Sequence, residues 1–305
     1  MAPPDLPTIG IVTPCLNQAE FLEQTIQSVL SQGYPKLQYV IMDGGSTDAS
    51  VKIIERYADS LHHWSSGPDG GQYAAIDAGL AHTDTDILAW LNADDFYLPW
   101  TLRAVATSFA AIPDMDWQTT FYPGFCDVHA RSVSFHRSTG YSRESFLDGR
   151  HCPNDERFIG YVPQESTFWR RSLWERVGGL AAGEAPLAGD FDLWARFAEH
   201  AQIYATTSSL AIFRHQPRQR SLEVEAYTSE ARESLARVNQ RLGRAAPTMT
   251  SVEGAGRFVG FFERTPGHES TINTPERTRY EGLCVAPTDL ESPEAGWGVK
   301  TYQFS

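Results

Sequence analysis

Short apolar runs alternate with segments of helical periodicity across the first third of the chain, and this alternation restricts the fold more than any other feature. A run of apolar and β-branched residues predicts a strand, whereas apolar residues three and four positions apart predict a helix. The predicted strands are 8–13, 37–42 and 87–91, and the predicted helices are 22–30, 51–61, 72–80 and the segment after Pro99. Strands that alternate with helices favour a mainly parallel, Rossmann-like sheet flanked by helices, so we expect an α/β fold.

The second half of the chain has a less regular pattern. Residues 117–169 mix aromatic residues, glycines and charges, which is typical of antiparallel strands and loops in a smaller mixed region. Helices are predicted at 170–177, 191–200 and 222–242, where apolar residues return to helical spacing. After Pro247 this periodicity fades, and we expect residues 246–305 to form an irregular C-terminal extension.

Net charge narrows the classes of partner. The 305 residues include 38 acidic and 25 basic side chains, which gives a net charge of −13. A surface for nucleic acid or for an anionic membrane needs clustered positive charge, so this composition argues against both. The surplus carboxylates could instead hold a divalent cation.

Targeting segments and paired cysteines are not predicted. The chain has no uncharged apolar stretch of about 18 residues, so we expect no integral membrane segment. Its start, Met-Ala-Pro-Pro-Asp, lacks the basic region and apolar run of a secretory signal. We interpret the four cysteines as free thiols of a cytosolic protein, because none has metal-ligand spacing. They are Cys15, Cys126, Cys152 and Cys284.

Polar residues follow three of the predicted strands. Ligands of a parallel α/β sheet bind outside the carboxyl ends of its strands. That rule selects Thr13-Pro14, Asp43 and Asn92-Ala93-Asp94-Asp95. An Asp-Gly-Gly sequence after a strand is also a common turn, and Asp94-Asp95 could cap the next helix. Two adjacent carboxylates behind an apolar strand repel unless a cation or solvent relieves them, which favours a metal site.

An ordered series of motifs resembles the family 2 glycosyltransferases, over roughly residues 8–221. The series is more specific than any single motif in it. Its first part consists of Ile11-Val12-Thr13-Pro14-Cys15-Leu16-Asn17, Phe21-Leu22, Ser28-Val29-Leu30-Ser31-Gln32, Asp43-Gly44-Gly45-Ser46-Thr47-Asp48 and Pro68-Asp69-Gly70-Gly71-Gln72. Trp90-Leu91-Asn92-Ala93-Asp94-Asp95 resembles the DxD-type motif of the family. Phe168-Trp169-Arg170-Arg171, Val177-Gly178-Gly179-Leu180 and Gly189-Asp190-Phe191-Asp192-Leu193-Trp194 resemble its acceptor-side half.

The resemblance implies a GT-A fold and transfer of a sugar, with inversion, from a nucleotide-sugar to an acceptor hydroxyl. It also implies one domain over 1–245, with a nucleotide-binding half at about 8–115 and an acceptor half at about 116–245. A divalent cation, Mn²⁺ or Mg²⁺, would stabilise the charge of the diphosphate leaving group.

Donor-binding positions follow from the same resemblance. Asp95 is the expected metal ligand and Asp94 the expected partner of the ribose or sugar. Asp43 and the backbone of Thr13 and Pro14 would hold the base, and a carboxylate that accepts from a uracil imide N–H favours UDP. The remaining positions carried over from the motifs are Asn17, Asp69 and Gln72.

Asp190 stands where the family places its general base, which a single displacement needs near the acceptor hydroxyl. The preceding residue is Gly189, whereas the family motif often has Glu there. Asp192 is two positions further and points elsewhere if both lie on a helix. The alternative is that Asp190 only caps the helix that follows it.

A basic loop follows an apolar run at 210–213. Similar enzymes have a His there, so His215 is a candidate metal ligand, and Arg214, Arg218 or Arg220 could neutralise phosphate. The alternative is a solvated basic loop. Gln164 and Trp169 are candidates for the acceptor pocket, because flat aromatic faces suit sugar rings, although Trp169 could equally be a core residue.

The chain lacks the Gln-x-x-Arg-Trp sequence of processive polysaccharide synthases. We therefore expect a cytoplasmic enzyme of single additions in bacterial polysaccharide or glycolipid assembly, in contact with the inner membrane if its acceptor is lipid-linked. The acceptor would be a saccharide or a lipid-linked molecule, and homo-oligomerisation is left open. Two other classes are a sugar-nucleotide nucleotidyltransferase and a noncatalytic carbohydrate-binding protein. The first needs a Gly-rich, basic loop after its first strand, which 13–17 lacks, and the second needs neither a metal pair nor a base.

Overall fold

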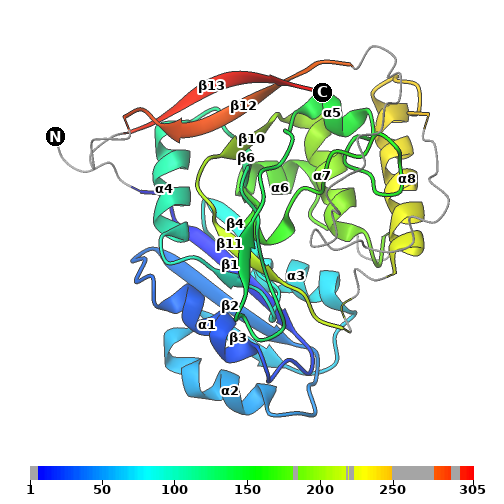
Figure 1. The fold of residues 1–305 in the computed structure, drawn as a ribbon. Helices are drawn as coiled ribbons and strands as arrows, with labels where there is room; N and C mark the ends of the chain where they lie inside the picture. The colour runs from blue at the N-terminus through cyan, green and yellow to red at the C-terminus, as the bar shows by residue number, and fades with distance from the viewer. Residues whose placement is uncertain (1–5, 181–184, 218, 220–222, 249–277, 290–295) are drawn as a thin grey trace.

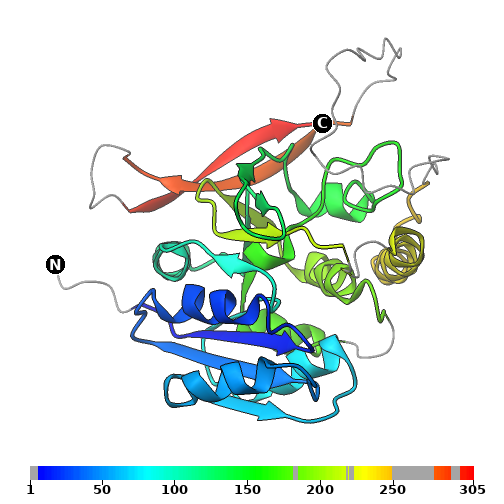
Figure 2. The same cartoon turned by 60° about the horizontal axis from the view of Figure 1, so that its bottom comes forward.

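The computed structural model describes residues 6–180, 185–217, 219, 223–248, 278–289 and 296–305. Within these ranges the chain forms a large twisted sheet with helices on both faces and a second, smaller sheet beside it (Figures 1 and 2). The order of the large sheet is β13-β12-β10-β6-β9-β4-β1-β2-β3, and that of the small sheet is β5-β11-β7-β8. This is the α/β architecture that the sequence predicts.

The first part of the chain consists mainly of parallel strands joined by helices, as the sequence predicts, and only the short β5 belongs to the small sheet. Strand β1 lies between β2 and β4 and pairs in parallel with both, and all three are nearly continuous apolar runs because helices cover the sheet. The elements are β1 (Ile9–Cys15), α1 (Leu22–Leu30), β2 (Leu37–Asp43), α2 (Ser50–Tyr57), the 3₁₀ turn η1 (Ala58–Ser60), β3 (His63–Ser66), α3 (Gln72–Ala81), β4 (Ile87–Trp90), β5 (Phe96–Tyr97) and α4 (Thr101–Ala111). The helix predicted at 51–61 therefore ends early, at Tyr57, and continues as η1.

The other half contains an antiparallel strand in the middle of the sheet. Strand β9 pairs antiparallel with both β4 and β6, and so joins the two halves through one continuous sheet. The elements are β6 (Trp117–Thr120), β7 (Gly124–Cys126), β8 (Val133–Phe135), α5 (Arg143–Leu147), the 3₁₀ turn η2 (Gln164–Ser166), β9 (Phe168–Arg170), α6 (Arg171–Val177), α7 (Gly189–His200), β10 (Ile203–Thr206), β11 (Ala211–Arg214) and α8 (Val224–Arg241).

The C-terminal extension is not uniformly irregular, which corrects the expectation for 246–305. Strands β12 (Tyr280–Pro287) and β13 (Trp297–Phe304) form an antiparallel hairpin, and β12 adds in parallel to β10 at the edge of the large sheet. Figure 1 shows this hairpin, in orange and red, lying across the top of the molecule. The Tyr302 hydroxyl bonds both the N–H (2.7 Å) and the C=O (3.0 Å) of Tyr141, so the hairpin is part of the packed domain.

A cluster of buried tryptophans lies where the two halves meet. Trp90 stacks on Trp194 at 5.7 Å and meets Trp169 edge-on at 5.4 Å, and Trp117 stacks on Trp194 at 5.6 Å. All four side chains are at most 1% exposed. Such aromatic pairs add rigidity beyond their buried area, and here they fix β4, β6, β9 and α7 against one another. Among the described helices, none is both long and apolar enough to cross a membrane.

Candidate active site

The polar turn after β4 is tied to the rest of the protein by hydrogen bonds. Asp95 is 1% exposed, and its Oδ1 accepts the backbone N–H of Arg214 at 2.9 Å. Its carbonyl accepts the Thr25 hydroxyl of α1 at 2.7 Å. The carboxylate of the neighbouring Asp94 accepts the side-chain amide of Gln216. The turn is therefore held by α1 on one side and by the end of β11 on the other.

Arg214 lies beneath this turn, which corrects its prediction as a phosphate ligand. Its side chain is buried, between the rings of Phe21 (4.8 Å) and Phe96 (5.4 Å). The guanidinium donates to the carbonyls of Asp94 (2.7 Å) and Val128 (2.9 Å) and to the Gln24 side chain (2.6 Å). Strand alternation turns this residue inward, and its charge is used to hold the aspartate turn. Arg218 and Arg220, the other basic candidates, lie outside the described residues.

The surroundings of Asp94 and Asp95 raise the pKa of both carboxyl groups. Burial raises the pKa of the Asp95 carboxyl well above its usual value, and the charges of Asp94 and Glu165 raise it further. Burial also raises the pKa of Asp94, although the Gln216 hydrogen bond and the Arg214 charge oppose that effect. A hard divalent cation would relieve this repulsion, and carboxylate oxygens are the ligands that Mg²⁺ and Mn²⁺ prefer.

The donor set thus fits a divalent cation that takes only part of its coordination from the protein. Among the described residues no group of three or more His, Cys, Asp or Glu side chains converges as a metal cage. His215, predicted as a ligand, has its ring stacked on Phe125 (5.7 Å) and edge-on to Phe213 (5.3 Å). Burial lowers the pKa of His215, which favours the neutral imidazole. Its role as a ligand stays a prediction.

Asp43 ends β2 and is held by donors from the loop that follows it and from Ser66 at the end of β3. Its Oδ2 accepts the N–H groups of Gly45 (3.1 Å) and Ser46 (2.9 Å) and the Ser66 hydroxyl (2.7 Å), and its Oδ1 accepts the Ser46 hydroxyl. Burial by itself would raise the pKa of this carboxyl, but these hydrogen bonds outweigh burial and lower it. Asp43 is therefore a buried carboxylate that stays ionised.

Neighbouring loops complete this edge of the sheet. Asn17 adopts a positive φ of 53°, and its side chain accepts the Thr47 N–H at 2.8 Å, so it fastens the loop after β1 to the loop after β2. Asp69 lies beside Gly44, where a Cβ would come within 3.0 Å of its carboxylate. Thr13 and Pro14 are buried in β1, and the Thr13 hydroxyl pairs with the Tyr39 hydroxyl at 2.9 Å, so only the backbone role remains open to Thr13.

A chain of side-chain amides connects α3, the turn after β4 and η2. Gln72, at the start of α3, donates to Asn92 at 2.8 Å, and Asn92 donates to Gln164 at 3.1 Å. Gln164 in turn donates to the Trp90 carbonyl at 2.8 Å. The structure therefore brings Gln72 and Gln164 together around the residue that precedes the Asp94–Asp95 turn.

Trp169 is a core residue, which was one of its two predicted roles, the other being a place in the acceptor pocket. Its side chain is completely buried in the tryptophan cluster of Trp90, Trp117 and Trp194. Glu165, in η2, is a further candidate that the motifs do not single out, and it is 4% exposed. Burial raises the pKa of Glu165 to about 7, and the charge of Asp190 adds to this effect. The only sequence feature that points to Glu165 is its position directly after Gln164.

Asp190 lies in the first turn of α7 and is contacted by two tyrosines. Its Oδ1 accepts the Phe191 N–H at 2.8 Å and the Tyr227 hydroxyl of α8 at 3.2 Å, and the Tyr73 hydroxyl of α3 lies 3.5 Å away. Burial raises the pKa of Asp190, partly opposed by these hydrogen bonds. A raised pKa suits a group that must accept a proton near neutral pH. The capping role considered as the alternative is not seen, because Asp190 lies inside α7 and the N-cap residue is Ala188, which makes no side-chain capping hydrogen bond.

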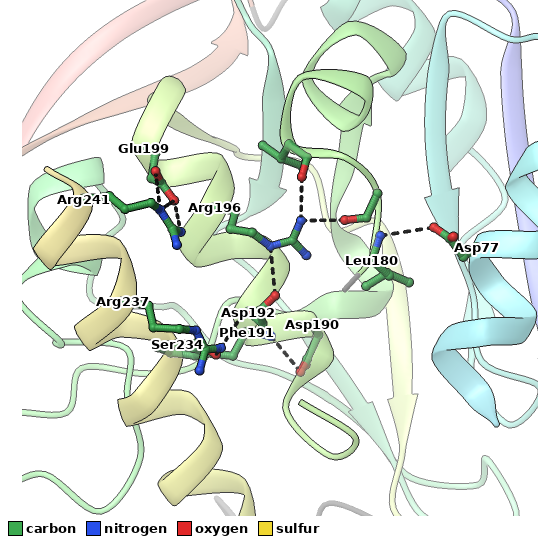
Figure 3. A network of polar contacts seen from close by, with 12 residues as sticks. Asp77, Leu180, Asp190, Phe191, Asp192, Arg196, Glu199, Ser234, Arg237 and Arg241 are labelled. Carbon is green, nitrogen blue, oxygen red and sulfur yellow. Dashed lines mark hydrogen bonds and ion pairs between the residues drawn. The ribbon is translucent and has the colours of Figure 1, made fainter. Parts of the chain in front are cut away.

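Figure 3 shows that Asp192 points away from Asp190, as the sequence predicts. Its carboxylate pairs with Arg196 at 2.9 Å and with Arg237 of α8 at 3.1 Å. Arg196 also donates to the carbonyls of Val177 and Gly179 in the loop after α6. Asp192 therefore fixes the helix on which Asp190 stands. Asp77 of α3 accepts the Leu180 N–H at 3.1 Å, which is a contact between the halves.

Solved structures of low sequence identity share this fold. The chain aligns with TarS of S. aureus, solved in complex with UDP-GlcNAc, with a TM-score of 0.51, 13% identity and coverage of 77% of this chain and 72% of that one. The mannosyltransferase PcManGT of Pyrobaculum calidifontis, solved with GDP-Man and Mn²⁺, gives a TM-score of 0.53 at 17% identity, over 81% and 69% of the two chains. These similarities establish the GT-A fold.

Relatives found by sequence are named glycosyltransferases. An uncharacterised glycosyltransferase of Mycobacterium tuberculosis strain H37Rv is 30% identical over 178 residues, which are 57% of this chain and 62% of the relative. Another, of Rickettsia typhi, is 24% identical over 201 residues, 65% and 61% of the two chains. The chain thus spans about three fifths of the length of these relatives. Residues 10–175, just over half of the chain, match the family described as Glycosyl transferase family 2. The chain therefore belongs to the family 2 glycosyltransferases.

Proposed function

We propose that the protein is a metal-dependent inverting glycosyltransferase that moves a sugar from a nucleotide-sugar to a hydroxyl of a saccharide or lipid-linked acceptor. The observation that carries the proposal is the arrangement at the start of α3. Gln72 contacts Asn92 beside the Asp94–Asp95 turn, and the next residue, Tyr73, contacts Asp190. A leaving-group site and a base site are thus joined by two consecutive residues.

Transfer in this site is a single displacement with one base. The acceptor hydroxyl gives its proton to Asp190, and its oxygen forms a bond to the anomeric carbon from the face opposite the leaving group. The bond between that carbon and the diphosphate oxygen breaks, and its electron pair leaves with the nucleoside diphosphate. A divalent cation held by Asp95 and Asp94 would stabilise the negative charge of the departing diphosphate. The amide chain of Gln72, Asn92 and Gln164 keeps the two halves of the site in register.

The proposed donor is UDP-linked. The ionised Asp43 carboxylate can accept the imide N–H of uracil, because Oδ2 already accepts three hydrogen bonds within the protein whereas Oδ1 accepts one. The similar structures were solved with UDP-GlcNAc and with GDP-Man, so both donors belong in the first assay.

We place the reaction in bacterial surface polysaccharide or glycolipid assembly, on the cytoplasmic side. Four unpaired cysteines accord with a reducing compartment.

Asp190→Asn tests the enzyme against the binding-protein alternative. The amide keeps the size and capping ability of aspartate but cannot take a proton, so transfer from UDP-sugars should fall by about 10²-fold or more. Binding of UDP with Mn²⁺, measured by thermal shift, should stay close to that of the unchanged protein. Asp59→Asn, at an exposed position of η1, is the matched control. Near-normal turnover of the Asp190 variant at saturating donor would refute the base assignment.

A further inference from the structure

The loop that precedes α7 is held by a carboxylate of α8. Oε2 of Glu230 accepts the backbone N–H groups of Leu187 (2.8 Å) and Ala188 (2.9 Å). The Leu187 carbonyl accepts the Tyr73 hydroxyl of α3 at 2.9 Å. The backbone just before Asp190 is therefore fixed from two sides, by α8 and by α3.

Gly189 allows this arrangement. A Cβ on Gly189 would lie 2.6 Å from the Tyr73 ring, closer than side-chain carbons approach one another. The family motif often has Glu at this position, and that side chain would displace the ring. The departure at Gly189 and the presence of Tyr73 are thus two parts of one packing arrangement.

The two oxygens of Asp190 have different surroundings. Oδ1 accepts the Phe191 N–H and the Tyr227 hydroxyl, which occupies both of its lone-pair directions. The Tyr73 hydroxyl has a single proton, which the shorter bond directs to the Leu187 carbonyl. Among the residues that the structure describes, which do not include 181–184 or 220–222, no group donates a hydrogen bond to Oδ2 of Asp190. Asp190 is half-buried.

We infer that α8, through Tyr227 and Glu230, positions Asp190 so that Oδ2 is the atom that accepts the proton of the acceptor hydroxyl. This inference rests on the proposed function, in which Asp190 is the base. Tyr227 and Glu230 are positioning residues, since each acts through Asp190 or its loop. They lie beyond residues 10–175, the part of the chain that matches the family, so part of the environment of the base is supplied by a segment outside that match.

Tyr227→Phe tests the hydroxyl alone, because the ring is kept. Without this donor the ionised form of Asp190 is less stabilised, so the pKa of Asp190 rises and the acidic limb of the kcat/KM profile moves to higher pH. At pH 6 we expect kcat/KM to fall by about tenfold, with a much smaller loss at pH 8.5. Tyr57→Phe removes a hydroxyl that contacts Glu23, on α1, and should leave the profile unmoved.

Glu230→Ala tests the loop. Loss of its carboxylate releases the Leu187 and Ala188 N–H groups, so kcat should fall at least tenfold while the thermal shift with UDP and Mn²⁺ is unchanged. Glu230→Gln keeps one carbonyl acceptor and should recover part of the rate. Glu233→Gln, at an exposed position of the same helix, is the control. Melting temperatures of all variants show whether a loss of rate reflects unfolding.

The outcomes separate the two proposals. Normal transfer by Asp190→Asn overturns the base assignment and the inference with it. If Asp190→Asn is inactive but folded Tyr227→Phe and Glu230→Ala keep both the rate and the pH profile of the unchanged protein, Asp190 stands as the base and the role of α8 is wrong. A variant of Tyr227 that lowers the rate equally at every pH also contradicts the inference, because a purely structural loss has that form.

Discussion

The two halves of the site are held by different kinds of contact. On the proposed donor side, Asp43 and Asp95 take their hydrogen bonds largely from backbone N–H groups close to strand ends and from short hydroxyl side chains of neighbouring segments. On the proposed acceptor side, long polar side chains of α8 hold the helix and loop that carry Asp190: Arg237 pairs with Asp192, and Glu230 accepts the Leu187 and Ala188 N–H groups. Backbone pairing is set by the sheet, whereas each long side chain is a separate point of failure. Substitutions of Asp43 and Asp95 should therefore affect mainly chemistry, and substitutions of the contacts between α7 and α8 should also affect stability.

Asp95→Asn should have the largest effect, and it should be confined to chemistry. Without the carboxylate the cation loses its main protein ligand, so we expect transfer to fall by about 10³-fold and stabilisation by UDP with Mn²⁺ to disappear. The free energy of unfolding without metal should hardly change, because the repulsion with Asp94 is removed as well. Metal-dependent binding as tight as that of the unchanged protein would show that Asp95 is not the ligand.

Asp192→Asn should have the opposite profile. It removes the partner of Arg196, whose side chain is 13% exposed, and also a bond from Arg237. Loss of one partner of a buried ion pair typically costs about 3–5 kcal/mol of stability. Urea denaturation measures this loss, and UDP affinity of the molecules that remain folded should be normal. A stable but inactive Asp192 variant would mean that it takes part in the chemistry.

Acidification should weaken the acceptor side through His151. This ring is buried between Tyr141 and Phe146, its Nδ1–H donates to the Gly160 carbonyl at 2.7 Å, and burial lowers its pKa to about 4. A His that is neutral in the folded protein contributes stability above its unfolded pKa of about 6.5, and this is lost as the pH falls from there to 4. The shift corresponds to roughly 3 kcal/mol. The stability of the His151→Gln variant should therefore depend less on pH in this window. Denaturation of the variant and of the unchanged protein at pH 7 and at pH 4.5 measures this dependence. An equal loss of stability in the two proteins between these pH values would exclude His151 as the cause.

Tyr302→Phe should have the smallest effect of the four. It leaves the Tyr141 N–H and C=O without the hydroxyl that bonds both, at a cost of about 1–2 kcal/mol. Differential scanning calorimetry should detect the lower melting temperature, and donor affinity should be unchanged. A variant as stable as the parent would indicate that the hairpin is held by packing of Phe304 and its neighbours alone.

The sequence predicts the donor half well because local signals there agree with the tertiary structure. Strands β1, β2 and β4 and the helices between them follow from periodicity, and the carboxyl-end rule selects Asp43 and Asp95. The acceptor-side helices are also close to prediction, with α8 expected at 222–242 and found at Val224–Arg241.

Failures occur where a residue's role depends on distant partners. Arg214 looks like a phosphate ligand in the sequence, but its orientation is set by β11 and by Phe21 and Phe96 on other elements. Tyr227 fits the apolar stripe of α8 by its position, while its hydroxyl reaches Asp190. The central position of β9 and the attachment of β12 to β10 depend on pairing between strands far apart in the chain, which periodicity does not encode.

The C-terminal hairpin has a consequence for shortened forms of the protein. Strand β12 covers the outer edge of β10 through the pairs Tyr204–Leu283, Ala205–Cys284 and Thr206–Val285. A chain cut at residue 245 would expose that edge, with its unpaired amides and carbonyls, in a position to recruit the same edge of another molecule. Such fragments should precipitate or form ordered aggregates even though every family motif is intact, and solubility on overexpression would reveal the difference before any assay of sugar transfer.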